Sequence, residues 1–368
     1  MKKILKIIAW FLLTIVMVFV ILVLMFNGIR WNDIRLQKHH YAQLEAKYGG
    51  DYEAIDEQTF VNFVLEESGL RLNEIQMIAS HNSYKKLGTG VGKLFIGLGD
   101  SFDEAHALRY GNPYLSEQLD DGIRSFELDV RYRRGDFEVT HVPLVDNSSV
   151  AVKLVLAFAE IALWSEHNPN HIPIILLLEL KDDWMMLDPF LQDIGTTELA
   201  LLDQLINEQL GDKIYTAGDL AGTYPTIQDR LDAESWPLVT ELLGKIIVVL
   251  HPGKWTSPYV AMHEHHQDLT MFPAVSNMNV NHDYAAFVVH NDPNVANIEM
   301  LINQNLIVRT RMDANLMIDE TTRTNALSSG AQLLTTDFHP SHQFEGVAYT
   351  YLDGEYTVIR NAILLPEV

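Results

Sequence analysis

Residues Pro173–Leu180 (PIILLLEL) form a run of consecutive apolar residues with one polar position, Glu179. A strand with one face in solvent alternates apolar and polar residues, whereas this run is apolar at successive positions. We therefore expect a strand that is buried on both faces, as in a parallel sheet covered by helices.

Similar short runs, rich in Ile, Val and Leu, recur on both sides of this segment. The other predicted strands are Ile75–Ala79, Ile123–Val130, Phe137–Thr140, Lys245–Leu250, Ala285–Val289, Leu306–Thr310 and Gln332–Thr335. Between them, Val150–Trp164 and Thr197–Gln209 carry apolar residues three and four positions apart, which indicates helices. Strands that alternate with helices in this way predict an α/β fold, a distorted (β/α)8 TIM barrel.

One connection does not fit a regular barrel. Only Arg131–Asp136 separates the second predicted strand from the third, and a crossover helix needs a dozen or more residues. The barrel is therefore irregular at this point, or Phe137–Thr140 is not one of its strands.

Polar residues stand at the carboxyl ends of several predicted strands, where barrel enzymes gather their chemistry. They are His81, Asn82, Glu127, Asp129, His141, Glu179, Lys181, Lys254, Arg309, Arg311, Asp313 and Asp337. Groups placed at these ends by many strands are expected to converge on one pocket.

Four of these residues form a candidate cation site. Glu127 and Asp129 share one face of their strand, where their charges repel unless a cation lies between them. With Asn82 and Glu179 they offer oxygen ligands only, which favours calcium or magnesium over zinc. Four protein ligands favour calcium, because magnesium prefers to keep its waters. The alternative is a pair of surface carboxylates on an exposed strand end.

Histidines suit acid–base chemistry near neutral pH, and His81 and His141 form a candidate pair beside the cation site. Two other segments carry less chemistry. His263–His266 is expected to be a solvated loop, because no second ligand pair accompanies it. Gly88–Gly99 lacks the spacing of a dinucleotide fingerprint. Its apolar residues either contact a bilayer near the active site or pack on the barrel.

Six segments, in order between Asn73 and Pro340, resemble the bacterial-type branch of the calcium-dependent phosphoinositide-specific phospholipases C. They are Asn73–Tyr84 (NEIQMIASHNSY), Glu117–Tyr132 (EQLDDGIRSFELDVRY), Thr140–Asp146 (THVPLVD), Pro173–Lys181 (PIILLLELK), Val308–Ala314 (VRTRMDA) and Ser329–Asp337 (SGAQLLTTD). The chain departs from the family pattern at Lys85, where a further histidine is frequent.

The resemblance implies a phosphodiesterase that cleaves phosphatidylinositol-like lipids to diacylglycerol and a cyclic inositol phosphate. It implies that His81 and His141 act as acid, base or transition-state donor. The implied calcium ligands are Asn82, Glu127, Asp129 and Glu179. The implied substrate-binding residues are Lys181, Lys254 and Arg311 for phosphate, with Asp313 and Asp337 for sugar hydroxyls or as partners of those cations.

Three alternatives to this function remain open. A glycerophosphodiester phosphodiesterase shares a barrel, two histidines and an acidic metal site, but that family typically shows His-Arg-Gly where this chain has His81-Asn82-Ser83. A phospholipase D-like sphingolipid hydrolase is a further relative. A non-catalytic binder of phospholipid headgroups is expected to lack at least one histidine or carboxylate, and all are present.

The N-terminus predicts a membrane anchor. Lys2, Lys3 and Lys6 precede the apolar run Ile7–Phe26, which is long enough to span a bilayer. No small-residue cleavage site follows, as a signal peptide would require. We expect residues 1–29 to form a cytoplasmic tip and single transmembrane span, 30–72 a helical stalk, and 73–368 the catalytic barrel, outside the cytoplasm.

Composition excludes some classes of function. The formal net charge of the 368 residues is −23, which argues against a nucleic-acid partner, because binding to phosphates requires basic patches. There are no cysteines, so disulfides, thiol catalysis and zinc–thiolate sites are excluded. The expected partners are a phospholipid or phosphodiester substrate and the membrane that holds the N-terminal helix.

Overall fold

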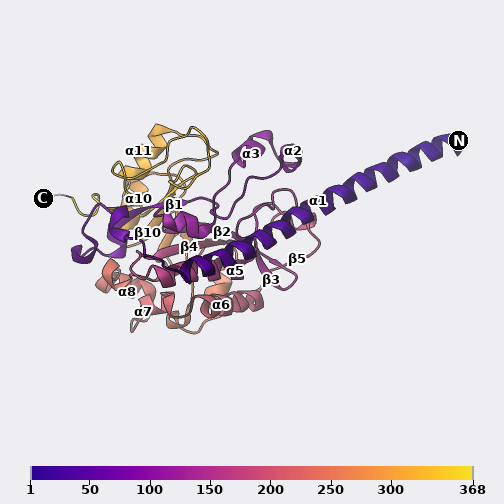
Figure 1. The fold of residues 1–368 in the computed structure, drawn as a ribbon. Coiled ribbons are helices and arrows are strands. Elements are labelled where there is room, and N and C mark those ends of the chain that lie inside the picture. The colour runs from indigo at the N-terminus through magenta and orange to yellow at the C-terminus, as the bar shows by residue number, and fades with distance from the viewer. Residues whose placement is uncertain (1, 367–368) are drawn as a thin grey trace.

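A computed structural model describes residues 2–366, which form a barrel and a long helix that projects from it (Figure 1). The staves of the barrel are β1 (Ile75–Ser80), β2 (Ser125–Arg133), β4 (Ile174–Leu180), β6 (Ile246–Leu250), β7 (Phe272–Pro273), β8 (Val275–Ser276), β9 (Phe287–Val289), β10 (Ile307–Arg311) and β11 (Leu333–Thr336). Their order is β7-β6-β4-β2-β1-β11-β10-β9-β8, and neighbours along it pair in parallel. Because only Ala274 separates β7 from β8, the sheet is a nearly closed barrel, as the sequence predicted.

One predicted barrel strand is wrong. β3 (Asp136–Val139) exists, but it pairs antiparallel with the far end of β2. Arg134 and Gly135, both at positive φ, form the tight turn between them. The missing stave is the segment Phe272–Ser276, which pairs with β6 through β7 and with β9 through β8. Two further short strands, β5 (Leu191–Gln192) and β12 (Val358–Arg360), pair antiparallel with β2 and β1.

Helices and short 3₁₀ turns fill the connections between staves. The helices after α1 are α2 (Gly90–Gly99), α3 (Phe102–Ala107), α4 (Leu115–Asp120), α5 (Leu154–His167), α6 (Thr196–Leu210), α7 (Ala217–Ala221), α8 (Ile227–Glu234), α9 (Thr256–Ala261), α10 (Val295–Ile302) and α11 (Glu320–Ser328). The 3₁₀ turns are Glu57–Phe60, Leu65–Glu67, Leu72–Glu74, Met185–Leu187, Gly211–Lys213, Val239–Glu241 and His266–Asp268. The two helices predicted from apolar spacing are therefore confirmed as α5 and α6.

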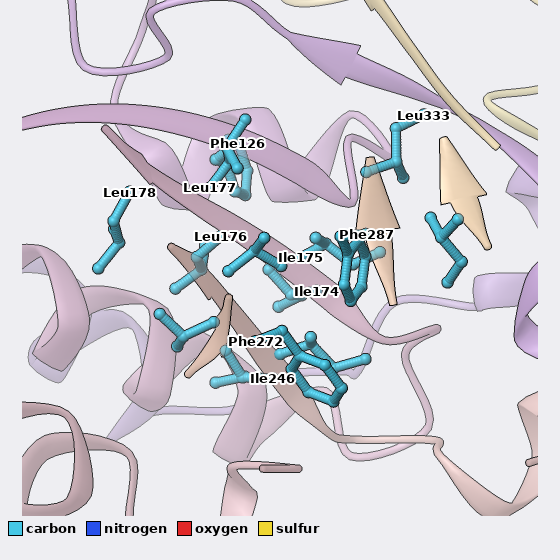
Figure 2. Close-up of a cluster of buried hydrophobic side chains, with 14 of the residues drawn as sticks. Phe126, Ile174, Ile175, Leu176, Leu177, Leu178, Ile246, Phe272, Phe287 and Leu333 are labelled. Carbon is cyan, nitrogen blue, oxygen red and sulfur yellow. The ribbon is translucent and has the colours of Figure 1, made fainter. Parts of the chain in front are cut away.

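The core explains why the staves are apolar at successive positions. Side chains of β4, β6, β7 and β9 fill the barrel (Figure 2), and those that point outward lie under the helices. The rings of Phe272 and Phe287 meet edge to face, with centroids 5.3 Å apart. Each fully buried Leu, Ile or Phe side chain stabilises the fold by about 1.5–3 kcal/mol.

The first helix, α1 (Lys2–Tyr48), runs without a break from the apolar N-terminus onto the barrel. Its first half has an 18-residue window with a mean hydropathy of 3.2, and none of that window is buried. Its second half buries one residue per turn against the domain: Phe26, Arg30, Asp33, Gln37, His40, Leu44 and Tyr48. The helix is therefore docked along about half of its length and is long and apolar enough over the other half to cross a membrane.

Removal of Glu57 is expected to destabilise the domain strongly. The Arg124 guanidinium is fully buried and donates two hydrogen bonds to the Glu57 carboxylate, at 2.8 and 2.5 Å. Glu57→Ala leaves this charge buried without its partner, which costs about 3–5 kcal/mol. Urea unfolding measures the loss, and Glu57→Gln, which keeps one acceptor, is expected to lose less. Equal stability of Glu57→Ala and wild type would contradict the argument.

Candidate active site

The register of the barrel places the first three polar positions at one level. Ser80 at the end of β1 lies opposite Phe126 of β2 and opposite Thr336 of β11. The residues that directly follow these three in the chain are His81, Glu127 and Asp337. The polar site therefore begins one residue beyond the last position at which β1 pairs with both β2 and β11.

Three carboxylates lie together in the barrel mouth. Asp129 and Glu179 are paired in the β2–β4 register, and Glu127 precedes Asp129 by two residues on the same face. One oxygen from each of the three lies within 4.8 Å of the others. Among the described residues, neither oxygen of the fully buried Asp129 has a hydrogen-bond partner. A buried carboxylate without partners is costly, so this cluster fits a bound cation.

The charges around the cluster are only partly compensated. Lys181 Nζ lies 2.7 Å from a Glu179 oxygen and 3.6 Å from Asp129. Burial raises the pKa of Asp129, and although Lys181 opposes this, repulsion from Glu179 and Glu127 adds to it. Burial acts in the same direction on Glu127, but the Arg309 guanidinium, with His81 and Arg311, outweighs it and lowers that pKa.

Arg309 is a site residue to which the sequence analysis gave no role. Its guanidinium donates a hydrogen bond to the Glu127 carboxylate and another to the Asn291 side-chain oxygen. In the sequence, Arg309 stands at the end of a predicted strand, two residues before Arg311. Because side chains alternate along a strand, this spacing already places both guanidinium groups on one face.

His81 is held by charged groups on both of its ring nitrogens. Asp337 Oδ1 lies 2.7 Å from Nδ1, and Arg311 Nη2 lies 3.3 Å from Nε2. Burial opposes ionisation of Asp337, but attraction to His81 and the hydrogen bond between them lower its pKa. The carboxylate beside Nδ1 fixes the orientation of the ring and directs Nε2 toward Arg311.

Asn82 takes a left-handed backbone conformation (φ 44°) that turns the chain directly after His81. Its amide nitrogen donates to Tyr110 Oη at 2.7 Å. Ser83 holds this turn against β2, because its amide donates to the Glu127 carbonyl at 3.0 Å and its hydroxyl accepts from the Glu127 amide at 2.9 Å. Asparagine tolerates the left-handed region better than most residues, which agrees with its presence here.

His141 follows the β2–β3 hairpin, and a cation-rich environment surrounds it. Its Nδ1 has no hydrogen-bond partner among the described residues, although Asp146 Oδ2 lies 3.7 Å away. The buried Lys85 ammonium lies 2.9 Å from that same oxygen. Burial, with Lys85 and Lys181 nearby, holds the pKa of His141 well below its usual range.

The remaining predicted residues lie in different environments. Asp313 is buried and accepts a hydrogen bond from the Asp337 amide at 2.8 Å. Lys254 instead has an exposed side chain, which pairs with Asp182 at the surface. In the His263–His266 segment, Glu264 and His265 are exposed, as expected, whereas His263 and His266 are partly buried and lie against Asp203 and the start of α8.

Asp313 is expected to make the stability of the protein depend on pH. Burial raises its pKa from 3.8 to about 6, although hydrogen bonds from the Asp337 amide and Thr336 oppose the shift. Between these values the folded state holds a proton that the unfolded state has released, so stability falls as pH rises. Asp313→Asn is expected to gain about 2.4 kcal/mol relative to wild type between pH 4 and pH 7. Urea unfolding of both proteins at both pH values measures this gain. A difference in unfolding free energy between variant and wild type that is the same at pH 4 and pH 7 would contradict it.

A pocket of about 700 Å³ opens beside His141. One wall comes from α2 and α3, with Phe95, Leu98 and Glu104, and another from the loop after β4, with Trp184 and Leu187. A histidine beside a pocket with apolar walls suits a substrate that has a polar reacting group and an apolar remainder.

Comparisons with known proteins agree with this arrangement. The family model described as "Phosphoinositide phospholipase C, Ca2+-dependent" matches residues 70–134 and 131–361. A search of curated protein sequences found no match. The fold is similar to that of a calcium-dependent phosphoinositol-specific phospholipase C from Pseudomonas sp. (TM-score 0.61, 19% identity, covering 83% of this chain and 100% of that one).

Two further solved structures are similar in fold. One is the myoinositol complex of the Pseudomonas enzyme, at TM-score 0.60 and 19% identity, with the same coverage of 83% and 100%. The other is a Ca²⁺-dependent phosphatidylinositol-specific phospholipase C from Streptomyces antibioticus, at TM-score 0.52 and 18% identity, covering 73% of this chain and 94% of that one. Because the family model spans most of the barrel, the chain belongs to the calcium-dependent phosphoinositide phospholipase C family of phosphoric diester hydrolases.

Proposed function

We propose that this chain is a membrane-anchored phospholipase C that cleaves phosphatidylinositol-like lipids to diacylglycerol and a cyclic inositol phosphate. The observation that carries the proposal is the buried Asp129 carboxylate, which has no hydrogen-bond partner among the described residues and lies in a three-carboxylate cluster beside His81. The solved relative that contains myoinositol supports an inositol headgroup as the ligand.

The ligands proposed for calcium are Asn82, Glu127, Asp129 and Glu179, all of which offer oxygen. When bound, calcium neutralises charge on the phosphate and lowers the pKa of the attacking hydroxyl. Four protein ligands in an irregular arrangement suit calcium better than magnesium, which demands octahedral geometry and retains waters.

His81 is proposed as the base. The inositol 2-hydroxyl oxygen forms the new bond to phosphorus, and its proton passes to Nε2 of His81. The contact of 2.7 Å between Asp337 and Nδ1 stabilises the imidazolium that results. Arg311, which lies 3.3 Å from Nε2 in the free protein, is placed to turn to a phosphate oxygen once substrate arrives.

The bond from phosphorus to the glycerol oxygen breaks, and that oxygen takes up a proton as diacylglycerol leaves. His141 lines the apolar pocket, where a diacylglycerol chain fits, so we assign its imidazole N–H as the hydrogen-bond donor to the leaving oxygen, which takes its proton from solvent. Lys181 is proposed to bind a phosphate oxygen from the other side of the carboxylate cluster.

Anchoring is part of the proposal. The exposed apolar half of α1 would cross the membrane once, with the barrel on the outer side. A signal sequence is the alternative for an apolar N-terminal helix. The buried Phe26 argues for retention, because it is the last residue of the apolar run, and cleavage after that run would remove a side chain that packs against the domain.

The proposal is tested with the full chain in detergent micelles that contain phosphatidylinositol. We expect release of a cyclic inositol phosphate with calcium and none with a chelator. Glycerophosphodiesters are assayed in parallel, and calcium-dependent cleavage of these alone would favour a glycerophosphodiester phosphodiesterase. Calcium and headgroup binding without cleavage of either substrate would favour a binding protein.

A further inference from the structure

A buried carboxylate on the docked half of α1 binds two segments of the barrel domain at once. Asp33 is 2% exposed, and one of its oxygens accepts a hydrogen bond from Lys86 Nζ at 2.7 Å. Its other oxygen accepts from the Ser149 amide at 3.3 Å. Lys86 lies five residues after His81 in the chain. Ser149 lies eight residues after His141. One helix residue therefore joins the segments that follow both candidate catalytic histidines.

These two segments also pair with each other, in antiparallel directions. The Val150 amide donates to the Tyr84 carbonyl at 2.9 Å, and the Lys86 amide donates to the Ser148 carbonyl at 3.2 Å. Two strands this short are marginally stable alone, so their pairing depends on the element that lies against them. The carboxylate on α1 supplies this support, because it holds one residue of each segment. Below, the short ladder denotes residues 84–86 and 148–150.

The helix also holds the residues on either side of the second segment. Asn147 Nδ2 donates to the Phe26 carbonyl at 3.1 Å. Gln37 exchanges two hydrogen bonds with the Lys153 backbone, at 2.9 and 3.1 Å. Directly after Lys153 the chain enters α5, which lies beside the docked half of α1 (Figure 1). Residues 147–153 are therefore fixed to α1 over about three helical turns.

Asp146 directly precedes this stretch and lies beside His141. Lys85 Nζ lies 3.0 Å from Asp146 Oδ1 and 2.9 Å from Oδ2, and both side chains are almost fully buried. Oδ2 also lies 3.7 Å from His141 Nδ1. Lys85, at which the chain departs from the family pattern, belongs to the short ladder. The short ladder therefore brings one partner of a buried ion pair to a candidate catalytic histidine.

This ion pair suits a histidine that donates a hydrogen bond from Nε2. In a neutral imidazole, the nitrogen that faces a free carboxylate carries the proton, and the other nitrogen has none. Here Lys85 binds both carboxylate oxygens, and His141 Nδ1 stands beyond hydrogen-bond distance. Nδ1 is also enclosed by protein, so Nε2 is the ring nitrogen open to substrate. The ion pair therefore favours a proton on Nε2, which the proposed donor role requires.

We propose that Asp33 is a positioning residue for His141, so that the docked half of α1 is part of the active-site framework as well as an anchor. Asp33 holds the short ladder together, and the ladder keeps Lys85 on Asp146. This ion pair in turn fixes the position and the proton of the His141 ring. The inference rests on the donor role proposed for His141. Calcium binding is expected to be unaffected, because the three clustered carboxylates come from β2 and β4.

Kinetics of the full chain in phosphatidylinositol micelles with calcium test this role. Asp33→Ala is expected to lower kcat about 10-fold or more and to leave KM nearly unchanged, because small misplacements of a reacting group have effects of this size. The matched control is His40→Ala, which removes another buried residue of the same helix face, whose partners Ser116 and Glu160 lie on α4 and α5. His40→Ala is expected to keep the kcat of wild type. Equal kcat values for the two variants would overturn the proposal.

A double-mutant cycle shows whether Asp33 acts through His141. In a His141→Ala background, Asp33→Ala is expected to lower kcat no further, and a further loss of the same size would overturn the proposal. Where Asp33→Ala does not fold, Asp33→Asn enters the same cycle and is expected to lower kcat by a smaller factor. It keeps an acceptor for the Ser149 amide and loses the ion pair with Lys86.

A measurement without catalysis separates the two proposals. ¹⁵N NMR of the histidine side chains in the full chain reports which nitrogen of His141 carries the proton, and the signal is assigned by its loss in His141→Ala. We expect the proton on Nε2, and a shifted signal in Asp33→Ala but not in His40→Ala. A wild type that cleaves no lipid but shows this response refutes the proposed function alone. An active wild type whose His141 signal does not change in Asp33→Ala refutes this inference alone.

Discussion

Replacement of Asp129 by asparagine is expected to abolish calcium-dependent cleavage and, in the same protein, to raise the melting temperature measured without calcium. Loss of a ligand from the proposed calcium site removes several kcal/mol of transition-state stabilisation, which corresponds to about 10³-fold in rate. Stability moves in the opposite direction, because a buried carboxylate without hydrogen-bond partners is replaced by a neutral amide. The expected gain is about 1–3 kcal/mol.

The measurement is a thermal melt with calcium and with a chelator, alongside the cleavage assay. Wild type is expected to gain stability on calcium addition, and Asp129→Asn is expected to gain none. Asp136→Asn is the matched control, because that carboxylate is 65% exposed and its ion pair is with Lys153. Calcium stabilisation of Asp129→Asn as large as in wild type would remove Asp129 from the cation site.

Replacement of His81 by alanine is expected to lower kcat about 10²–10⁴-fold, the usual contribution of a positioned base. The ring lies between Asp337 and Arg311, so its removal also leaves the buried Asp337 carboxylate without its principal partner. Calcium stabilisation in the thermal melt is expected to persist, because His81 is not a proposed ligand. This retention distinguishes the loss of a base from the loss of the cation.

His265→Ala serves as the control for His81→Ala, because the His265 side chain is 66% exposed on the loop after α9. It is expected to leave kcat and stability unchanged within about 0.5 kcal/mol. Activity of His81→Ala close to that of wild type would disprove the role of His81 as the base. A variant that no longer responds to calcium would instead place His81 in the cation site.

The sequence predicted the barrel because of a local property. Strands buried on both faces must be apolar at successive positions, and Pro173–Leu180 and its counterparts are long enough to show this. The segment Phe272–Ser276 was missed, because β7 and β8 have two residues each, too few to show a periodic pattern. Phe137–Thr140, in contrast, was wrongly placed in the barrel. Its composition is that of a strand, and composition does not distinguish a parallel stave from the arm of a hairpin.

For the site, the sequence by itself determined which side chains stand at strand ends and which of them share a face, as for Glu127 and Asp129. Only the tertiary structure decided which of them meet. It joined Arg309 to Glu127 across the barrel, placed Asp337 on His81, and left Lys254 at the surface with Asp182. The physical reason is that alternation and strand ends are local properties of the backbone, whereas ion pairs depend on barrel closure. Closure brings together residues as far apart in the chain as His81 and Asp337, which are 256 positions apart.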